Sequence, residues 1–446
     1  MSRGKQELSD RDVIIIGAGA AGLAAAERLA GARRSALVLE ARDRIGGRIW
    51  SHQEPGLAVP VELGAEFIHG RPEATFMLLE KADTAAVDSA GRSRGERWSL
   101  RDGKLEPSDD LFSEIRYAMK RMPKLKKDVS FDAFLARHLR KEVSPEACAF
   151  ARMLAEGYDA VDTKRASSRA IIEEWTGGGS VEMSQFRPLG GYGPLLSHLA
   201  SQLHGTSVDL QLNTVVKAVR WARGSVKVEG TFLGRPFEAR AKRAIVTLPV
   251  GVLQLPASAP GGVRFTPALK AKRDALMHLA LGPVIKMVLR FRTAFWETLD
   301  GGRYRNVAFF HPRQEAFPTF WTALPVRAPL LVAWAGGPKA AALSGASKAK
   351  IVEHALTSLT ALFGDRAKIE SELESAWVHD WQRDRHARGA YSYVTVGGDN
   401  AREALAKPLL RTLFFAGEAA DTEGEAGMVA GALQSGVRAA REVLSS

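Results

Sequence analysis

The chain has 446 residues, of which 46% are hydrophobic, 25% charged and 8% aromatic, and its formal net charge is +12. This length predicts two or three domains, and the share of apolar residues excludes a mostly disordered chain. The single cysteine, Cys148, excludes a disulfide scaffold and a thiolate-bound zinc or iron–sulfur site, and we expect no metal centre.

The N-terminal residues, the lack of a long apolar run and the placing of the basic residues indicate a location and a class of partner. The first ten residues are polar and lack the apolar core of a secretory signal, and no apolar run reaches the ~18 residues of a membrane span. We therefore expect a cytoplasmic protein without an integral membrane anchor. The basic clusters at 33–34, 124–127 and 270–273 lie near apolar residues, so we interpret them as solvated helix faces and expect no nucleic-acid partner.

The first element in the chain is a dinucleotide-binding pattern. Val13 to Ile16 are four β-branched residues, typical of a buried strand, and GAGAAG follows with the GxGxxG spacing. Residues 23–30 continue as a helix, and residues 35–39 form a second strand that ends at Glu40. The glycines permit a tight turn and a close backbone approach to a pyrophosphate, while the carboxylate suits ribose hydroxyls and repels the extra phosphate of NADP.

Further along, RDRIGGRIWS and VELGAEFIHG are loops rich in small residues, and Glu62, Glu66 and His69 in the second could approach a ring system. His69 could equally be an ordinary loop histidine. We predict helices over residues 110–122 and 131–139, and a glycine-rich turn leading into a helix over 187–200. Strands are predicted over 214–219, 225–228, 244–248 and 413–416, and a last helix from Met428.

Together these segments resemble the flavin-dependent amine oxidase family, which includes monoamine oxidases, polyamine oxidases and flavin lysine demethylases. The resemblance covers nearly the whole chain, and the joint order of its motifs is specific although each alone is not. The motifs are GAGAAG with Glu40, RIGGRIWS, ELGAEFIHG, TLPVGVL, GPVIKMVLRF, DWQRDRHARGAYSYV and LFFAGEAADTEGEAGMVAGALQSG.

The resemblance implies a mixed fold of α/β and α+β parts. A Rossmann-like FAD-binding domain, built from residues 1–75, 205–265 and 381–446, would be interleaved with a substrate-binding domain of mixed sheet and helices, built from residues 76–204 and 266–380. By the motif alignment, the residues implied to bind FAD are Gly17, Gly19, Ala20, Ala21, Gly22, Glu40, Ala41, Arg42, Gly46, Gly47, Arg48, Leu63, Gly64, Ala65, Glu66, Val216, Trp381, Gly417, Glu418, Gly427, Met428 and Val429.

The resemblance also implies three catalytic residues. Lys286 matches the lysine that reaches flavin N5 through a water, although the strand alternation by itself favours a solvated face that Lys286 shares with Arg290. Trp381 matches a tryptophan near the flavin. Tyr391 matches one wall of an aromatic pair that sandwiches the amine, although it could equally be a core aromatic.

The implied substrate residues are His69, Tyr391, Met428 and Glu66. Met428 stands where the second aromatic wall is expected, so the sandwich is incomplete and a different or bulkier amine could fit. His69 matches a histidine of many polyamine oxidases. The sequence does not choose among Glu66, Asp159, Glu173 and Glu174 as ligands of a distal ammonium.

Ala390 occupies the position where monoamine oxidases carry the cysteine that tethers FAD, so the resemblance implies non-covalent FAD. The implied reaction oxidises a primary or secondary alkyl amine or a polyamine to an imine, with O2 reduced to H2O2. A homodimer is one assembly that the chain could form. Alternatives are an L-amino-acid oxidase, for which Arg71 and Arg187 are candidate carboxylate ligands, a demethylase, and a non-oxidase flavoprotein such as a desaturase or maturase.

Overall fold

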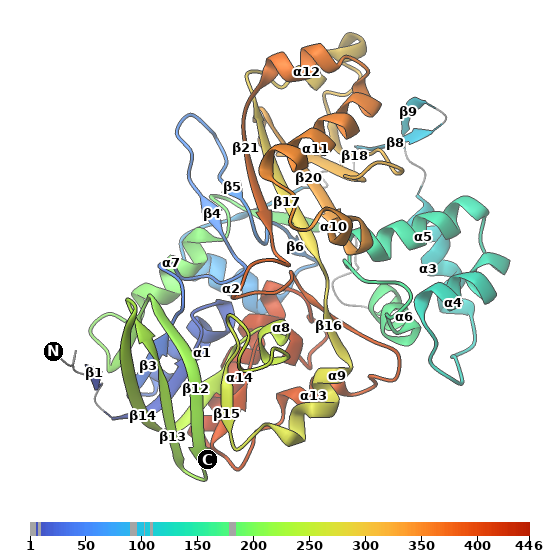
Figure 1. Ribbon diagram of the computed structural model, residues 1–446. Coiled ribbons are helices and arrows are strands. Elements are labelled where there is room, and N and C mark those ends of the chain that lie inside the picture. The colour runs from blue at the N-terminus through green and yellow to red at the C-terminus, as the bar shows by residue number, and fades with distance from the viewer. Residues whose placement is uncertain (1–5, 8–9, 90–95, 102, 108–109, 178–183) are drawn as a thin grey trace.

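Two large sheets lie at opposite ends of the protein, as the computed structural model shows (Figure 1). The structure describes residues 6–7, 10–89, 96–101, 103–107, 110–177 and 184–446. Most of the N-terminal segment in which we expected no secretory signal lies outside these ranges. Among the described residues, no helix has both the length and the apolar character needed to cross a bilayer.

The nine-stranded sheet contains the strands predicted over residues 13–16, 35–39, 214–219, 225–228, 244–248 and 413–416. Its order is β11-β3-β2-β14-β13-β12-β15, with β1 and β23 also paired to β14. The bounds are β1 (Gln6–Glu7), β2 (Arg11–Ile16), β3 (Ala36–Leu39), β11 (Val208–Gln211), β12 (Thr214–Ala222), β13 (Ser225–Phe232), β14 (Arg235–Val246), β15 (Arg264–Thr266) and β23 (Leu413–Phe415). β11, β3, β2, the end of β14 and β23 run parallel, whereas β12, β13 and β14 form an antiparallel meander.

Helices cover both faces of this sheet. On one face lie α1 (Ala20–Gly31), α2 (Glu73–Lys81), α7 (Gly193–Ser201) and α14 (Val429–Leu444). The alanine-rich α1 lets α14 approach closely, since a Cβ at Gly436 would collide with the carbonyl of Ala21. On the other face lie α8 (Val250–Leu253), α9 (Arg273–Met277) and α13 (Ala401–Ala406). Because helices bury both faces of the parallel part of the sheet, its strands are continuous runs of apolar residues.

The seven-stranded sheet has the order β21-β17-β20-β19-β18-β8-β9. Its bounds are β8 (Glu96–Arg101), β9 (Lys104–Pro107), β17 (Val284–Phe291), β18 (Val307–His311), β19 (Thr319–Thr322), β20 (Leu330–Gly336) and β21 (Leu373–Asp380). Ile285, Met287 and Leu289 of β17 pack under α10 (Gly337–Leu343) and α11 (Lys348–Phe363), and α12 (Arg366–Glu372) follows. The opposite face packs on Val61 and Leu63.

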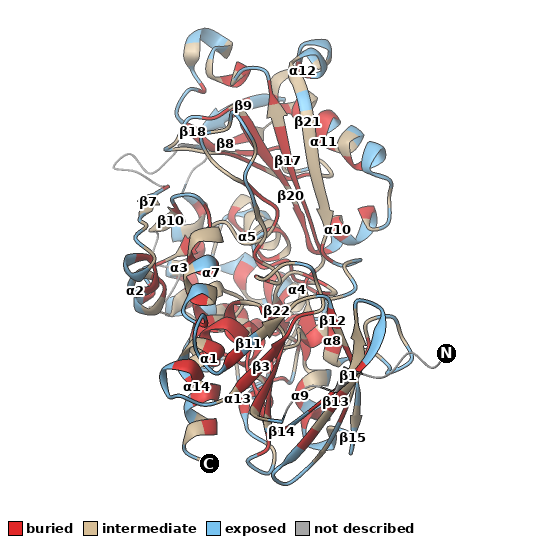
Figure 2. Ribbon diagram, turned by 90° about the vertical axis from the view of Figure 1, so that its left-hand side faces the viewer, coloured by how far each residue is buried: buried red, intermediate tan, exposed pale blue. Residues whose placement is uncertain are grey.

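Lys286 lies on that opposite face of β17, with Val284 and Val288. All three are buried, and Lys286 is only 1% exposed. A solvated face for Lys286, one of the two interpretations open from the alternation, is therefore wrong. The two faces of the sheet look alike in sequence because both are covered, as the red central strands β17 and β20 of Figure 2 show.

A helical cluster and three small sheets connect the two ends. The helices are α3 (Leu111–Arg121), α4 (Phe131–Arg137), α5 (Pro145–Gly157) and α6 (Ser168–Thr176), packed around Phe131, Phe134 and Trp175. Each begins at a serine or aspartate whose side chain accepts a backbone N–H. The sheets are β6 (Ile68–His69), β10 (Gln185–Pro188) and β7 (Ala86–Asp88); β4 (Ser51–His52) and β5 (Val61–Glu62); β16 (Leu279–Leu281) and β22 (Ser392–Val394).

One basic cluster is not fully solvated, in contrast to the prediction. Arg33, Arg34 and Arg273 are exposed as expected for solvated faces, but Lys272 is 1% exposed. Its ammonium donates to the carbonyl of Ala404 at 2.8 Å and to that of Lys407. A cation at the end of α13 satisfies carbonyls that the helix leaves open, so this lysine is a cap and not a surface charge.

Candidate active site

A cavity of about 860 Å³ is lined by residues at the ends of strands of the nine-stranded sheet and by strand residues of the seven-stranded sheet. Every residue predicted to bind a cofactor or substrate, or to act in catalysis, lines it, except Gly22 and Leu63. The cavity therefore brings together side chains that are up to about 400 positions apart in the sequence.

The glycine turn forms one wall of the cavity and leaves room for a ligand. Gly17 has φ +111°, a conformation that L side chains rarely adopt. A Cβ at Gly22 would collide with the carbonyl of Gly17, which keeps α1 close to the turn. α1 begins after Gly19 with no side-chain cap, so its free N–H groups lie at the cavity wall. This geometry fits a pyrophosphate.

Glu40 closes the second strand at the same wall. Its side chain is 6% exposed, and its two oxygens accept backbone N–H groups from Ala18 at 2.8 Å and from Arg42 at 2.9 Å. These bonds fix the carboxylate where the glycine turn meets the 42–48 loop. A fixed acceptor in that position fits a ribose diol.

Arg48 ties three distant motifs together. Its guanidinium donates to Glu418 at 2.9 Å and to the carbonyl of Ala390. Glu418 in turn accepts from the hydroxyl of Ser392 at 2.6 Å. The predicted last helix begins nearby as α14, with Met428 as an N-cap that offers no side-chain bond. A second uncapped helix N-terminus thus lies at the cavity, positive end inward.

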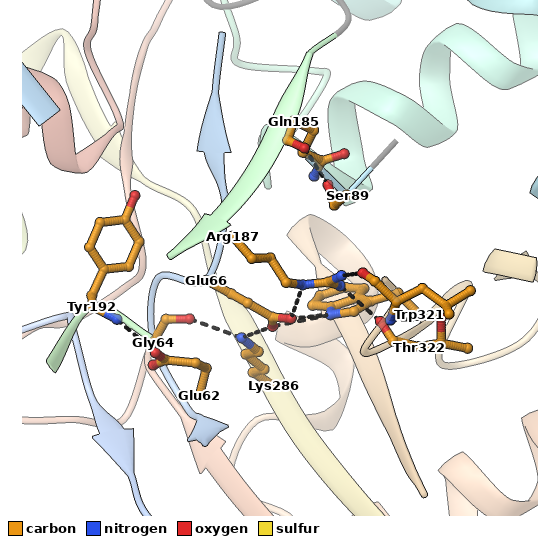
Figure 3. A network of polar contacts seen from close by, with 11 residues as sticks. Glu62, Gly64, Glu66, Ser89, Gln185, Arg187, Tyr192, Lys286, Trp321 and Thr322 are labelled. Atoms are coloured by element: carbon orange, nitrogen blue, oxygen red, sulfur yellow. Dashed lines mark hydrogen bonds and ion pairs between the residues drawn. The ribbon is translucent and has the colours of Figure 1, made fainter. Parts of the chain in front are cut away.

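Lys286 and Glu66 form the centre of a buried network (Figure 3). The Lys286 ammonium lies 2.7 Å from Oε2 of Glu66 and 3.0 Å from the carbonyl oxygen of Gly64. Arg187 and the indole N–H of Trp321 also donate to Glu66, each at 3.0 Å. Burial alone would raise the pKa of Glu66, but the charges of Lys286 and Arg187 hold it below its usual value. Both oxygens of Glu66 are therefore engaged.

Arg187 and Arg71 were the candidate carboxylate ligands of an amino-acid oxidase. Besides Glu66, Arg187 donates to the carbonyls of Thr322, at 2.8 Å, and Leu324, so its guanidinium is committed to the protein. Arg71 lies over the ring of Phe76, 4.6 Å from its centre, and is not part of the cavity wall. Neither is placed to hold a substrate carboxylate.

Glu62, next to this network, is a buried carboxyl with a structural role. Its Oε1 accepts from the hydroxyl of Ser51 at 2.7 Å and from the backbone N–H of Tyr192 at 3.0 Å, which anchors the start of α7. Its Oε2 is buried without a hydrogen-bond partner in the described protein. Burial raises the pKa of Glu62 to about 7.

The aromatic residues of the cavity are held by backbone carbonyls. The Trp381 indole donates to the carbonyl of Leu63 at 2.9 Å, and the Tyr391 hydroxyl donates to that of Tyr158. The His69 ring packs edge-on against Tyr158, with centres 5.2 Å apart. Burial, with a smaller effect of the Arg97 charge, lowers the pKa of His69 to about 4, so the imidazole is neutral at pH 7.

The cavity wall around Tyr158 also holds charged residues. Asp159, the next residue, accepts from the Trp175 indole at 3.0 Å, and burial together with the neighbouring Glu174 raises its pKa. Arg97 lines the same cavity, and its guanidinium carbon is 4.8 Å from the centre of the Phe309 ring. Sequence reasoning missed Tyr158 and Arg97, because neither belongs to a motif or a periodic segment.

The comparisons with known proteins cover nearly all of the chain. It is 29% identical to Probable polyamine oxidase 4 of Arabidopsis thaliana, with 98% of this chain and 88% of that protein aligned. It is 28% identical to Lysine-specific histone demethylase 1 homolog 3 of the same plant and 25% identical to human Lysine-specific histone demethylase 2. The chain spans only 30% and 54% of the length of these two demethylases.

Solved structures show the same fold. Wild-type putrescine oxidase bound to putrescine superposes with a TM-score of 0.80 at 22% identity, over 99% of this chain and 100% of the other. Cyclohexylamine oxidase from Brevibacterium oxydans superposes with a TM-score of 0.78 at 20% identity, over 98% and 99%. A family model described as flavin-containing amine oxidoreductase matches residues 20–444, and the chain belongs to that family.

Proposed function

We propose that the protein is an FAD-dependent oxidase that converts a primary or secondary alkyl amine, or a polyamine, to an imine and reduces O2 to H2O2. The observation that carries the proposal is a single cavity lined both by the glycine turn with Glu40 and by Lys286, Trp381 and Tyr391. When bound, the flavin would take a hydride equivalent from the carbon that bears the amine and transfer the electrons to O2.

The chain's own residues fit this cofactor. We assign the pyrophosphate to Gly17, Gly19 and the N-terminus of α1, the ribose to Glu40, and the adenine to the backbone at Val216. Gly417 and Glu418, with Arg48 beside them, suit the ribityl-phosphate end, and the N-terminus of α14 suits the flavin ring. The described chain has no cysteine in the cavity wall, which supports non-covalent binding.

The two sheets support the proposed division of the chain. The nine-stranded sheet draws nearly all its strands from residues 1–75, 205–265 and 381–446, which we assign to FAD binding. The seven-stranded sheet and the cluster of α3 to α6 come from residues 76–204 and 266–380, which we assign to substrate binding. The cavity between them then positions the amine against the flavin and excludes bulk water.

Substrate contacts fall to Tyr391 and Met428 as the two walls, with His69 farther along the cavity. A substrate ammonium has to lose its proton before its carbon can give up a hydride. Asp159 and Glu174 line the cavity together with Tyr391, and a carboxylate of this pair would attract the cation and take its proton. Burial raises the pKa of both carboxyls, which makes either a better proton acceptor. Glu66 was one candidate for this role, but Lys286 and Arg187 neutralise it, so we assign it to positioning Lys286.

The test is a panel of mono-, di- and polyamines and amino acids with the purified holoenzyme. The proposal requires that at least one amine bleaches the flavin under anaerobic conditions and releases H2O2 once oxygen is admitted. A non-oxidase flavoprotein would release no H2O2 with any amine. An L-amino-acid oxidase would prefer amino acids, in conflict with the committed Arg187 and the peripheral Arg71.

A further inference from the structure

We propose that Arg97 and His69 form an anion-binding subsite in the cavity, and that the preferred substrate is an amine whose far end carries a carboxylate. This inference rests on the proposed amine oxidation and names its substrate class more closely. The subsite would favour such amino-carboxylates over polyamines, because a polyamine would place a second cation beside Arg97.

The guanidinium of Arg97 is available to a ligand. Arg97 lies on β8, where its backbone pairs with Phe309 of β18, and it lines the cavity while its surface stays accessible. In the part of the chain that the structure describes, no carboxylate forms an ion pair with it. Among the described carboxylates, the one whose charge acts on it is that of Asp110, whose two oxygens accept from the backbone and the hydroxyl of Ser113.

Arg97 and Arg187 stack on similar rings but differ in their hydrogen-bond partners. Both arginines lie over a phenylalanine ring, Arg187 over Phe67 at 4.4 Å and Arg97 over Phe309 at 4.8 Å. Arg187 also has a carboxylate and two carbonyls as partners, whereas Arg97 has only the ring among the residues that the structure describes. The accessible donors of Arg97 can therefore form charge-assisted hydrogen bonds with a ligand carboxylate.

His69 supplies a second donor at the same place. Its ring nitrogens have no hydrogen-bond partner among the described residues, and its ring lies in the cavity wall against Tyr158. A neutral imidazole carries one N–H that can point to a carboxylate oxygen without adding charge. His311, which stacks on Phe309 with ring centres 6.3 Å apart, extends the same wall.

Tyr158 lies between this subsite and the reacting end of the cavity. The rings of Phe309, Phe67, His69 and Tyr158 are in contact in that order, with the Arg97 guanidinium over the first. At the other end of this row, the Tyr391 hydroxyl donates to the Tyr158 carbonyl, and Asp159 follows Tyr158 in the chain. A molecule with an ammonium at one end and a carboxylate at the other matches the acidic Asp159 and the basic Arg97.

The experiment compares three substrates of one chain length: 5-aminopentanoate, pentylamine and 1,5-diaminopentane, together with longer homologues of each set. We expect kcat/KM for the best amino-carboxylate to exceed that for its matched alkylamine and diamine at least about tenfold, the effect of one charge-assisted hydrogen bond. Equal rates, or a preference for the diamine, would overturn the subsite and leave amine oxidation standing.

Arg97→Met should lower kcat/KM for the amino-carboxylate about 10- to 100-fold and leave the alkylamine within about threefold, whereas Arg97→Lys should recover part of the loss. Arg71→Met removes a ring-stacked arginine outside the cavity and serves as the matched control. A loss that is equal for both substrates would show a structural role and contradict the proposal.

Binding can be measured without turnover. Pentanoate and hexanoate lack an amine, so their dissociation constants for the holoenzyme, measured by calorimetry, report the subsite alone. We expect Arg97→Met to weaken this binding about tenfold or more, even if no tested amine is oxidised. Equal affinity in wild type and Arg97→Met would sink the subsite independently of the proposed reaction.

Discussion

The ammonium of Lys286 and the carboxylate of Glu66 lie 2.7 Å apart inside the protein, one on β17 of the seven-stranded sheet and the other on the loop between β5 and β6. The pair joins the sheet that we assign to the substrate side to a loop that lines the cofactor side. Because Glu66 also accepts from Arg187 and Trp321, the position of Lys286 is fixed by a network of three other side chains.

Lys286→Met removes the cation from this network and should slow either flavin reduction or the reaction of the reduced enzyme with O2 at least tenfold, about 1.4 kcal/mol in the barrier. Rapid-mixing absorbance measures the two half-reactions separately. Arg290→Met is the matched control, since Arg290 lies four residues on in the same strand but pairs with surface carboxylates. Wild-type rates in both half-reactions of Lys286→Met would remove its catalytic role.

Gly22→Ala should abolish or strongly weaken flavin binding, because its Cβ would push α1 away from the Gly17 carbonyl and open the turn. The ratio of flavin to protein absorbance in the purified variant measures this. Gly31→Ala, at the other end of α1, meets nothing within 4 Å and should keep its flavin, with stability raised by roughly 1 kcal/mol. Full flavin occupancy in Gly22→Ala would contradict the assigned turn.

The flavin should leave the protein on denaturation, since Ala390 offers no thiol and Cys148 lies in the helical cluster, outside the cavity wall. Acid precipitation followed by centrifugation is expected to leave the yellow colour in the supernatant. Colour retained in the washed pellet would show a covalent link and overturn this expectation.

The rate of flavin reduction should rise with pH between 6 and 9, because only the neutral amine can give up a hydride. His69, with a pKa of about 4, does not titrate in this range. Anaerobic reduction rates at saturating substrate measure the profile. A flat profile would mean that deprotonation is complete before the amine binds, and would remove the proton-accepting role of Asp159 and Glu174.

Glu62→Gln should change how stability depends on pH. The pKa of Glu62 is raised from 4.5 to about 7 in the folded protein, so its contribution is fully present below pH 4.5 and is lost as pH rises through 7. The amide keeps an acceptor for Ser51 and Tyr192 without this titration. Relative to wild type, the variant should gain up to about 3 kcal/mol between pH 5 and 8, seen as a difference in unfolding transitions. An unchanged difference across that range would contradict the raised pKa.

The parts that could be predicted from sequence are those in which local pattern and final environment agree. The turn at Gly17 to Gly22 and the acid at Glu40 are fixed within one βαβ unit, so spacing alone indicates their chemistry. The first half of β14 is not predicted, because its polar and apolar residues alternate in an antiparallel meander and form no continuous apolar run.

The features that could not be predicted depend on tertiary packing. Lys272 and Lys286 look like surface lysines in sequence, and only the carbonyls and carboxylate brought to them from distant segments explain their burial. Arg97 and Tyr158 belong to no motif, and they reach the cavity because β8 pairs with β18 and because α5 ends beside β22 and its preceding loop. No local pattern carries that information.

The bonds from Arg48 to Glu418 and to the carbonyl of Ala390 span 370 and 342 positions of the chain. The cofactor pocket therefore does not exist until the last β-strand and α14 have been synthesised and have packed on the first βαβ unit. Flavin uptake therefore reports that β23 and α14 are in place, and a truncation shortly before residue 413 should leave a protein that cannot retain the cofactor even though its glycine turn is intact.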